Sequence, residues 1–595
     1  MITRPILPGS AAGGRGYAVG VTDARDETDA RAASAEDVPT PASTPGSAST
    51  PGADSADAEF SRIALGYPDE PLRLPPTRKP AGPGTRLDAW WQQRRLDPRW
   101  HRLATWGAPA IVLLVAIITR LVNLSSPHAL VFDETYYAKD AWSQLHLGYE
   151  GSWTDGDDAK FLAGDTDVYS PTASFVAHPP LGKWVIALGM MAFGVQDALG
   201  WRISVAIVGI LLVVLTMAIA HGLFRSRIIT ALSGGLLAID GNAIVMSRVA
   251  LLDVILALFC LLGVGAMLLD RAWAKRRIEA WVVQRELGHK PTDWGRPIWW
   301  RPWMLAAAVA FGAASAVKWS GIWFLAIFAI LSIVMEAIDR RRAGIAFWPT
   351  SAVLVQGPVS FLLLVPLAAA VHLASWTGWF VSDDGYDRHW IESGGGTAWT
   401  GGLAWVPTAF QNWYHYQASM YGFHVGESTP HSYQANPLTW LFLVRPTSMY
   451  YQESDGGASA AAITEIANPL IWWACTAALV FLIYRFIRTR QYGVGVLLVG
   501  IAAGYLPWMG YLQRTVFQFY TIVFEPFLVI GLAVALAHLL GRWNDPPSRR
   551  LTGLATVGGF LILAIALSIY WFPMWIGLPM PHDFIYSHYW LRSWL

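Results

Sequence analysis

The chain has 595 residues and a net charge of +1, and its residues are 54% hydrophobic but only 14% charged. Soluble domains carry roughly twice that charged fraction, which excludes an ordinary soluble protein, and the near-zero net charge argues against nucleic acid as a partner. The 32 tryptophans are typical of a protein with many membrane–water interfaces. Cys260 and Cys475 lie inside apolar runs, so we expect buried hydrophobic residues rather than disulfide or zinc partners.

The N-terminal part differs in composition from the rest of the chain. Residues 1–85 are rich in Ser, Pro, Ala, Gly and Asp and cannot bury a core, so we predict a disordered cytoplasmic tail. The first residues lack the basic segment and apolar core of a cleaved signal peptide. Residues 86–105 are basic and aromatic, which indicates a juxtamembrane segment at the cytoplasmic face.

Apolar runs long enough to cross about 30 Å of hydrocarbon recur along residues 106–595. They predict an all-α polytopic membrane protein with about 11 transmembrane helices. The shorter run 181–194 is predicted to be a helix that lies in the membrane interface. The predicted spans are Trp106–Val122, Ile203–His221, Ile228–Ile244, Val249–Leu269, Pro302–Val317, Gly321–Ile338, Pro349–Leu373, Pro469–Tyr484, Gly493–Tyr511, Val516–Leu540 and Leu551–Phe572.

The distribution of Lys and Arg orients these spans. With the N-terminus in the cytoplasm, about 24 cations lie near cytoplasmic helix ends and about 11 lie on the other side. Loops with more and with fewer cations alternate along the whole set of spans. An odd number of spans then places the C-terminus on the extracytoplasmic side. Two large extracytoplasmic loops are predicted, over residues 123–200 and 374–467.

The first of these loops contains "HALVFDETYYAKDAW", in which Asp133 and Glu134 precede two tyrosines. Loop acids are most often simply solvated, and a single cation at a helix end is most often an anchor that reaches toward the headgroups. Several cations on the side where few are expected predict instead an anion site, for which a lipid phosphate is the natural ligand. These cations are Arg202, Arg248, Lys318, Arg445 and Arg514.

An acid near phosphate-binding cations is what sugar transfer from a lipid phosphate requires. A base deprotonates the incoming hydroxyl, and cations stabilise charge on the departing phosphate. We predict Asp133 as that base, whereas Glu134 either binds substrate hydroxyls or fixes a neighbouring arginine. His178, in "HPPLGKW", either hydrogen-bonds the phosphate or caps its turn. Glu525, a few turns into a span, is expected to be paired or to face a cavity.

Five segments resemble protein O-mannosyltransferases, which are glycosyltransferases of the GT-C fold. They are "FDETYYAKDAW", "HPPLGKW", "GWRISVAIVG", "SRVALLDVILALF" and "SAVKWSGIW", and they occur in the order expected for that family. The resemblance implies that residues 106–595 form a GT-C catalytic domain in the cell membrane. It implies an inverting transfer of mannose from polyprenyl-phosphate-mannose to Ser or Thr hydroxyls of exported proteins, with membrane lipids and the export channel as further partners.

The resemblance also implies roles for particular residues. Asp133 would be the catalytic acid group with Glu134 beside it in the acceptor site, and Arg202 would contact the lipid phosphate. Lys318 is expected to share that phosphate role, and Arg248 and Asp253 are expected to pair with each other and brace the site. We further predict phosphate contacts from Arg514 and His178, with Tyr136 and Tyr520 in support.

Three questions stay open on the sequence alone. The second loop is too short for the β-trefoil insertion of eukaryotic members, so a bacterial, actinobacterial form is predicted and acceptor selection is unassigned. No metal-ligand spacing stands out, which leaves a divalent cation such as Mg²⁺ or Mn²⁺ as an open cofactor. The alternatives are a GT-C enzyme with a lipid or glycan acceptor, and a lipid or sugar transporter, which would line its path with polar groups at mid-depth.

Overall fold

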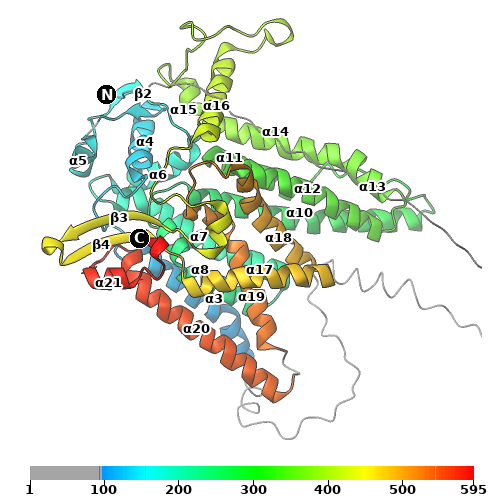
Figure 1. Cartoon of the computed structure of the whole chain (residues 1–595). Coiled ribbons are helices and arrows are strands. Elements are labelled where there is room, and N and C mark those ends of the chain that lie inside the picture. Colours follow the sequence, from blue (N-terminus) through cyan, green and yellow to red (C-terminus); the bar gives the residue numbers. More distant parts are fainter. Residues whose placement is uncertain (1–92, 94–96, 155, 543–544) are drawn as a thin grey trace, which may run out of the picture. The chain divides into compact units, whose positions relative to one another are not determined.

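The computed structural model describes residues 93, 97–154, 156–542 and 545–595. The predicted tail over residues 1–85 and part of the segment 86–105 therefore lie outside the described residues. Helices make up most of the described chain (Figure 1). Seven helical segments in this part are long and apolar enough to cross a membrane: α7 (Leu199–Phe224), α10 (Asp253–Leu287), α12 (Gly321–Arg342), α13 with α14 (Trp348–Ser375), α17 (Pro469–Thr489), α18 with the turn after it (Tyr492–Tyr511) and α20 (Pro547–Trp575).

Further apolar helical segments in the described part have 10 to 17 residues. They are Thr105–Leu121 within α3 (Pro98–Leu121), α6 (Leu181–Phe193), α8 (Arg227–Ile239), α11 (Pro302–Val317) and α19 (Glu525–Leu540). Each of the eleven predicted spans overlaps one of the long or short apolar helices, so the helical, multi-pass class is confirmed, while the number of spans stays a prediction. The small helices are α4 (Glu134–Leu147), α5 (Asp157–Leu162), α9 (Gly241–Met246), α15 (Thr377–Val381), α16 (Thr408–Gly426) and α21 (His582–Ser587).

Two predicted spans are not continuous α-helices. The span predicted over Ile228–Ile244 stops at Asp240, whose carboxylate accepts a hydrogen bond from the Asn242 amide and begins the separate helix α9. The span predicted over Val516–Leu540 starts as a 3-10 turn, and α19 begins only at Glu525, followed by Pro526 at the position where its missing N–H is harmless. Apolar composition alone cannot distinguish such breaks from a continuous helix.

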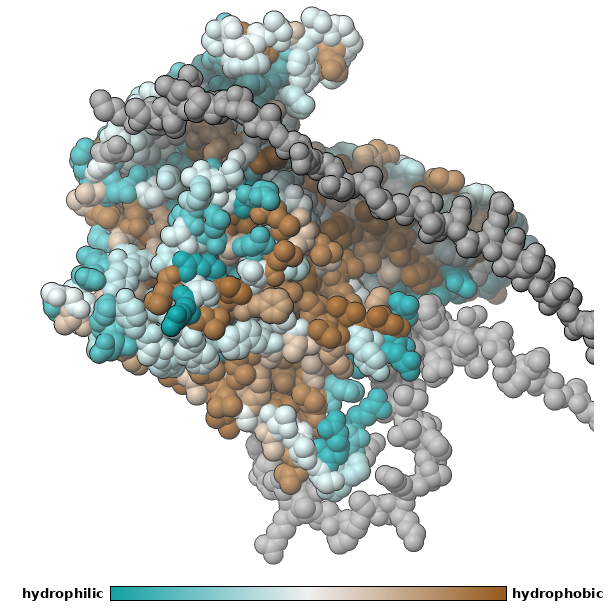
Figure 2. All heavy atoms as spheres, in the orientation of Figure 1, coloured by the Kyte–Doolittle hydropathy of each residue, from teal (hydrophilic) through white to brown (hydrophobic). Residues whose placement is uncertain are grey.

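Two small antiparallel sheets accompany the helices. Strand β1 (Gly151–Ser152) pairs with β2 (Ser170–Ala173), and a three-stranded sheet has the order β3 (Thr447–Ser454), β4 (Ser459–Glu465), β5 (Pro579–Pro581). The expectation of helices alone therefore missed these strands, which lie in the two predicted loops and near the C-terminus. Figure 2 shows that the helical part of this face is largely apolar and that the projecting β3–β4 hairpin is more hydrophilic.

Close packing of α4, α6, α7 and α10 fixes the loops that carry the site. Helices α6 and α7 approach at glycines, since a Cβ added to Gly189 would lie 2.4 Å from the Gly200 carbonyl oxygen. The helix predicted over residues 181–194 is present as α6, with one face buried and residues such as Leu188 and Met191 exposed, while its place in the membrane interface stays a prediction. Gly182 of the "HPPLGKW" segment packs against Leu252, just before α10, and Val317 at the end of α11.

Candidate active site

The backbone before α4 turns the two adjacent acids in different directions. Phe132 has a positive φ of 52°, a strained conformation for an aromatic residue, and its ring packs edge-on against Phe517 and Phe519 at 5.5 and 5.8 Å. Helix α4 starts immediately afterwards, and successive helical side chains point about 100° apart. The Asp133 carboxylate makes no capping hydrogen bond to the backbone of α4, all of which is described, whereas Glu134 turns into the core.

Glu134 and Arg202 form a fully buried pair. Nε and Nη2 of Arg202 donate to the two carboxylate oxygens at 2.8 and 2.7 Å, and the amides of Val131 and Ala250 donate to the same oxygens at 2.8 Å each. The remaining Arg202 N–H groups reach the carbonyls of Leu124, Pro127 and Ala129.

This geometry corrects two predicted roles. All five N–H donors of Arg202 are used within the protein, so its guanidinium is not available to a lipid phosphate. The Glu134 carboxylate is likewise saturated and does not reach an acceptor site. Of the two roles open for Glu134, the structure shows the fixing of a neighbouring arginine.

Arg248 binds backbone carbonyls and does not contribute to the predicted phosphate site. Its guanidinium donates to the carbonyls of Arg120, Val122 and Asn123 at 2.8 to 2.9 Å and so caps the C-terminal end of α3, where a positive charge is favourable. The predicted pair between Arg248 and Asp253 is therefore wrong. Asp253 accepts instead from the Lys318 Nζ at 2.8 and 2.9 Å.

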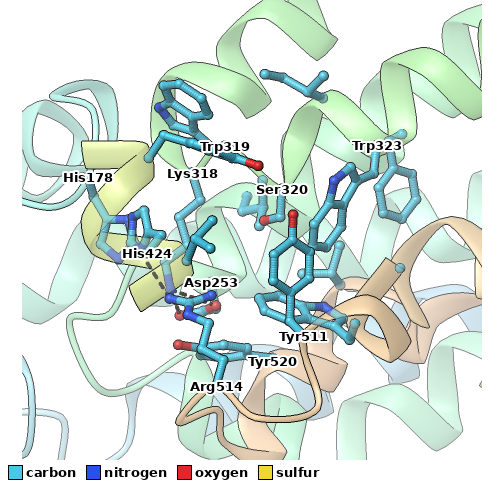
Figure 3. Close-up of a pocket in the computed structure, with 18 residues that line it drawn as sticks. His178, Asp253, Lys318, Trp319, Ser320, Trp323, His424, Tyr511, Arg514 and Tyr520 are labelled. Carbon is cyan, nitrogen blue, oxygen red and sulfur yellow. Dashed lines mark hydrogen bonds and ion pairs between the residues drawn. The ribbon is translucent and has the colours of Figure 1, made fainter. Parts of the chain in front are cut away.

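Lys318 and Asp253 line a cavity of about 220 Å³ (Figure 3). Lys318 follows α11 and Asp253 begins α10, so the ends of two helices place this pair, while Tyr520 lies under the ammonium group at 4.9 Å. Arg514 reaches the same end of the cavity from the segment between α18 and α19. Two of the predicted phosphate-binding cations, Lys318 and Arg514, thus meet at one place although 196 residues separate them in the sequence.

The other side of the cavity is aromatic and apolar. Figure 3 shows Trp323 and Tyr511 across the cavity from the histidines and Arg514. Trp323 packs edge-on against Trp508 at 5.0 Å, and both belong to the lining. The chain therefore offers an anion-binding end joined to a wall that suits a hydrocarbon tail. The apolar lining residues are Leu256, Ile322, Trp323, Phe324, Val425, Trp508 and Val523.

Asp133 lies within electrostatic range of Lys318 and Asp253 at the polar end of the cavity. Burial raises the pKa of its carboxyl to about 6, the Lys318 charge lowers that pKa, and the Asp253 charge raises it. A carboxyl with a pKa near 6 is a suitable general base at neutral pH, because it is ionised yet still accepts a proton readily. The neighbouring Asp140, in the middle of α4, has its pKa raised to about 7 by burial, and Lys183 counteracts that shift.

Two histidines from different loops complete the polar end. The rings of His178 and His424 stack with centroids 4.8 Å apart, and Arg514 Nη2 donates to His424 Nδ1 at 2.9 Å. Burial lowers the pKa of His178 well below its usual value and that of His424 to about 4, so both rings are neutral. Within the described residues, the buried Nε of Arg514 and Nδ1 of His178 have no hydrogen-bond partner, as expected where a ligand supplies oxygen atoms.

Some predicted residues lie away from the cavity. Tyr136 is 64% exposed, whereas the next residue, Tyr137, is the one that turns toward His178. Arg445 binds backbone carbonyls, including that of Ser432, and takes no part in the anion site. Glu525 accepts from Asn242 inside the helix bundle, which matches the expected pairing of this carboxyl.

Comparison with known proteins decides the family. Residues 110–371 match the family described as dolichyl-phosphate-mannose-protein mannosyltransferase, and residues 409–594 match the C-terminal four-transmembrane region of protein-O-mannosyltransferase. The chain is 32% identical over 507 residues to the polyprenol-phosphate-mannose–protein mannosyltransferase of Mycolicibacterium smegmatis, covering 83% of this chain and 93% of that protein. The chain belongs to the protein O-mannosyltransferase family. A Corynebacterium glutamicum protein of the same name is 31% identical, with 83% and 94% covered.

The fold agrees with this family. The structure is similar to the S. cerevisiae protein O-mannosyltransferase Pmt1-Pmt2 complex bound to the sugar donor, with a TM-score of 0.62 and 14% sequence identity over 82% of this chain and 92% of that one. The predicted GT-C fold class and the family resemblance are therefore confirmed. At 14% identity this likeness supports the fold, and the roles of individual residues are argued from the geometry.

Proposed function

We propose that this protein transfers mannose from a polyprenyl-phosphate-mannose donor to Ser or Thr hydroxyls of exported proteins. The observation that carries the proposal is one cavity with Lys318 and Arg514 at its polar end and a hydrocarbon-compatible aromatic wall, with the Asp133 carboxylate outside the lining but within electrostatic range of Lys318. The relatives in Mycolicibacterium and Corynebacterium are protein mannosyltransferases by name, which favours a protein acceptor over the lipid-acceptor, glycan-acceptor and transporter alternatives.

The geometry supports a single-displacement mechanism. The donor phosphate lies against Lys318 and Arg514, and the prenyl chain runs along Trp323 and Trp508 toward the lipid. Asp133 takes the proton of the acceptor hydroxyl. At the same time the oxygen of that hydroxyl forms a bond to the anomeric carbon from the face opposite the phosphate. The bond between that carbon and the phosphate oxygen breaks, its electron pair stays on the phosphate, and the two cations stabilise the added charge. The products are an inverted mannoside and polyprenyl phosphate.

The donor atoms on these residues do not form a divalent cation site. Within the described part of the chain, no three His, Cys, Asp or Glu side chains converge in a way that could hold a metal ion, and Asp253 is occupied by Lys318. The proposed transfer uses only the side chains named above and involves neither Mg²⁺ nor Mn²⁺.

The membrane orientation is part of the proposal. Helix α12 begins with the cavity residues Ile322 and Trp323 and ends with Arg340, Arg341 and Arg342. Its length of about 33 Å is enough to cross about 30 Å of hydrocarbon, so the cavity and this basic end lie at opposite faces. If the basic end is cytoplasmic, as cations near helix ends favour, the cavity faces the extracytoplasmic side, with the N-terminus inside and the C-terminus outside.

A transfer assay tests the function and the orientation together. Purified protein in sealed vesicles should move labelled mannose from polyprenyl-phosphate-mannose to a membrane-impermeant Thr-rich peptide. Transfer is expected only when the extracytoplasmic face is turned toward the peptide. A labelled lipid or glycan as the sole product would refute the protein acceptor, and transfer from the cytoplasmic face would refute the orientation.

Lys318→Met is expected to raise the donor KM at least about tenfold, because it removes a charge-assisted contact to the phosphate. The single variant also leaves Asp253 without its partner, so the double variant Lys318→Met with Asp253→Asn is the matched control. The donor KM should stay raised in the double variant if Lys318 binds phosphate. Recovery to the normal KM would show that the unpaired Asp253 had caused the defect. Exposed Arg592→Gln should change nothing.

The pH dependence of kcat/KM tests whether Asp133 is the base. The value of kcat/KM should fall about tenfold per pH unit below pH 6, because Asp133 with a pKa of about 6 must be deprotonated to accept the proton. Asp253→Asn should move the midpoint to lower pH, since the Asp253 charge raises the Asp133 pKa. Asp140 also titrates in this range, so Asp140→Asn serves as the control and should leave the midpoint in place. If Asp140→Asn shifted the midpoint, Asp140 would be the base in place of Asp133.

A further inference from the structure

Arg514 differs from Arg202, Lys318 and Lys183 in the charge of its partner. Arg202 binds Glu134, Lys318 binds Asp253 and Lys183 binds Glu150, so each is at least partly neutralised by a carboxylate. The Arg514 guanidinium donates instead to an uncharged ring, at His424 Nδ1 2.9 Å away, and it also lies 5.5 Å from the centre of the Trp508 ring.

Hydrogen bonds on both ring nitrogens fix the tautomer of His424. Its Nε2 lies 2.6 Å from the Ala177 carbonyl oxygen, which can only accept, so Nε2 carries the proton. In the neutral ring Nδ1 is then bare and accepts from Arg514. Stacking against His178 holds the plane of the ring. One side chain on α16 thereby connects the "HPPLGKW" segment of the first loop to the segment that carries Arg514.

We propose that His424 is a positioning residue of the phosphate site, an inference that rests on the proposed function. Its bare Nδ1 holds the Arg514 guanidinium in place at the cavity without cancelling its charge. A carboxylate in that place would also orient Arg514, but it would neutralise the cation and repel the phosphate. A neutral imidazole gives the orientation without adding a negative charge to that of Glu427, which partly offsets Arg514, so the cation stays attractive to the donor and to the departing polyprenyl phosphate.

The surroundings keep this ring uncharged. Burial is the main cause of its lowered pKa, and the Arg514 and Lys318 charges lower it further, while the Ala177 hydrogen bond and the Glu427 charge oppose them. His178, the other titratable group against the ring, is also neutral. The contact between Arg514 and His424 therefore persists across the physiological pH range, and only near pH 4 would protonation of His424 break it.

Two isosteric variants separate the two hydrogen bonds of His424. The amide oxygen of His424→Asn falls near Nδ1 and can still accept from Arg514, whereas the amide nitrogen of His424→Gln falls near Nε2 and can still donate to Ala177. His424→Leu removes both. We expect His424→Leu and His424→Gln to raise the donor KM and the inhibition constant of polyprenyl phosphate about tenfold, with the peptide KM unchanged. His424→Asn should restore most of both values.

A double-mutant cycle completes the test. On an Arg514→Gln background, His424→Leu should have no further effect on the donor KM, because the group that it positions is gone. Rescue by His424→Gln instead of His424→Asn, or independent effects in the cycle, would overturn the proposal in favour of a purely structural link to Ala177. If the unmodified protein transfers no mannose and is not inhibited by polyprenyl phosphate, the proposed function itself fails.

Discussion

Replacing Asp133 with asparagine should reduce mannose transfer by about 10²- to 10⁴-fold. The substitution keeps the size of the side chain and removes only the group that can take a proton. Because the Asp133 carboxylate makes no capping hydrogen bond within α4, the helix should start normally in the variant. The loss should therefore appear in kcat, with the polyprenyl phosphate affinity unchanged or slightly higher, since Lys318 and Arg514 remain in place.

The control for this variant comes from the same loop. Asp167 is exposed between α5 and β2, and Asp167→Asn should retain full activity. Unfolding temperature and inhibition by polyprenyl phosphate, measured on both variants, show whether the fold and the donor site survive. Near-normal transfer by Asp133→Asn would remove Asp133 from the mechanism, and the cavity would then need another base.

The sequence predicted the parts of the site that depend on local signals. Cations at helix ends on the sparsely charged side are visible without a structure, and Lys318, Arg514 and His178 do line one cavity. The predicted spans all overlap an apolar helix because hydrophobicity over about 20 residues is a strong signal.

Pairing between distant residues was not predictable in the same way. Asp253 is only five residues from Arg248, yet it binds Lys318, since both lie at helix ends that α10 and α11 bring together. His424 comes from a loop without a recognisable motif, and nothing in its neighbourhood indicates that it meets Arg514. The choice between Tyr136 and Tyr137 required knowing where α4 begins, because one residue turns a helical side chain by about 100°.

Breaking the Glu134–Arg202 pair should destabilise the protein by about 3–5 kcal/mol. Arg202→Met leaves a buried carboxylate with two amide donors and no cation, and it frees the carbonyls of Leu124, Pro127 and Ala129. Glu134→Gln leaves the buried Arg202 guanidinium without a compensating negative charge. Either variant should lower the unfolding temperature in detergent by many degrees and reduce the yield of folded protein.

The donor KM distinguishes this structural role from a phosphate contact. Folded Arg202→Met protein should bind polyprenyl phosphate normally, because Arg202 has no N–H directed at the cavity. The double variant Glu134→Leu with Arg202→Met should recover part of the lost stability, since an apolar pair avoids the cost of a lone buried charge. A variant of normal stability with a raised donor KM would place Arg202 on the lipid phosphate after all. Asp133 and Glu134, the partner of Arg202, would then both belong to the donor site, although the backbone at Phe132 turns the two acids toward different neighbours.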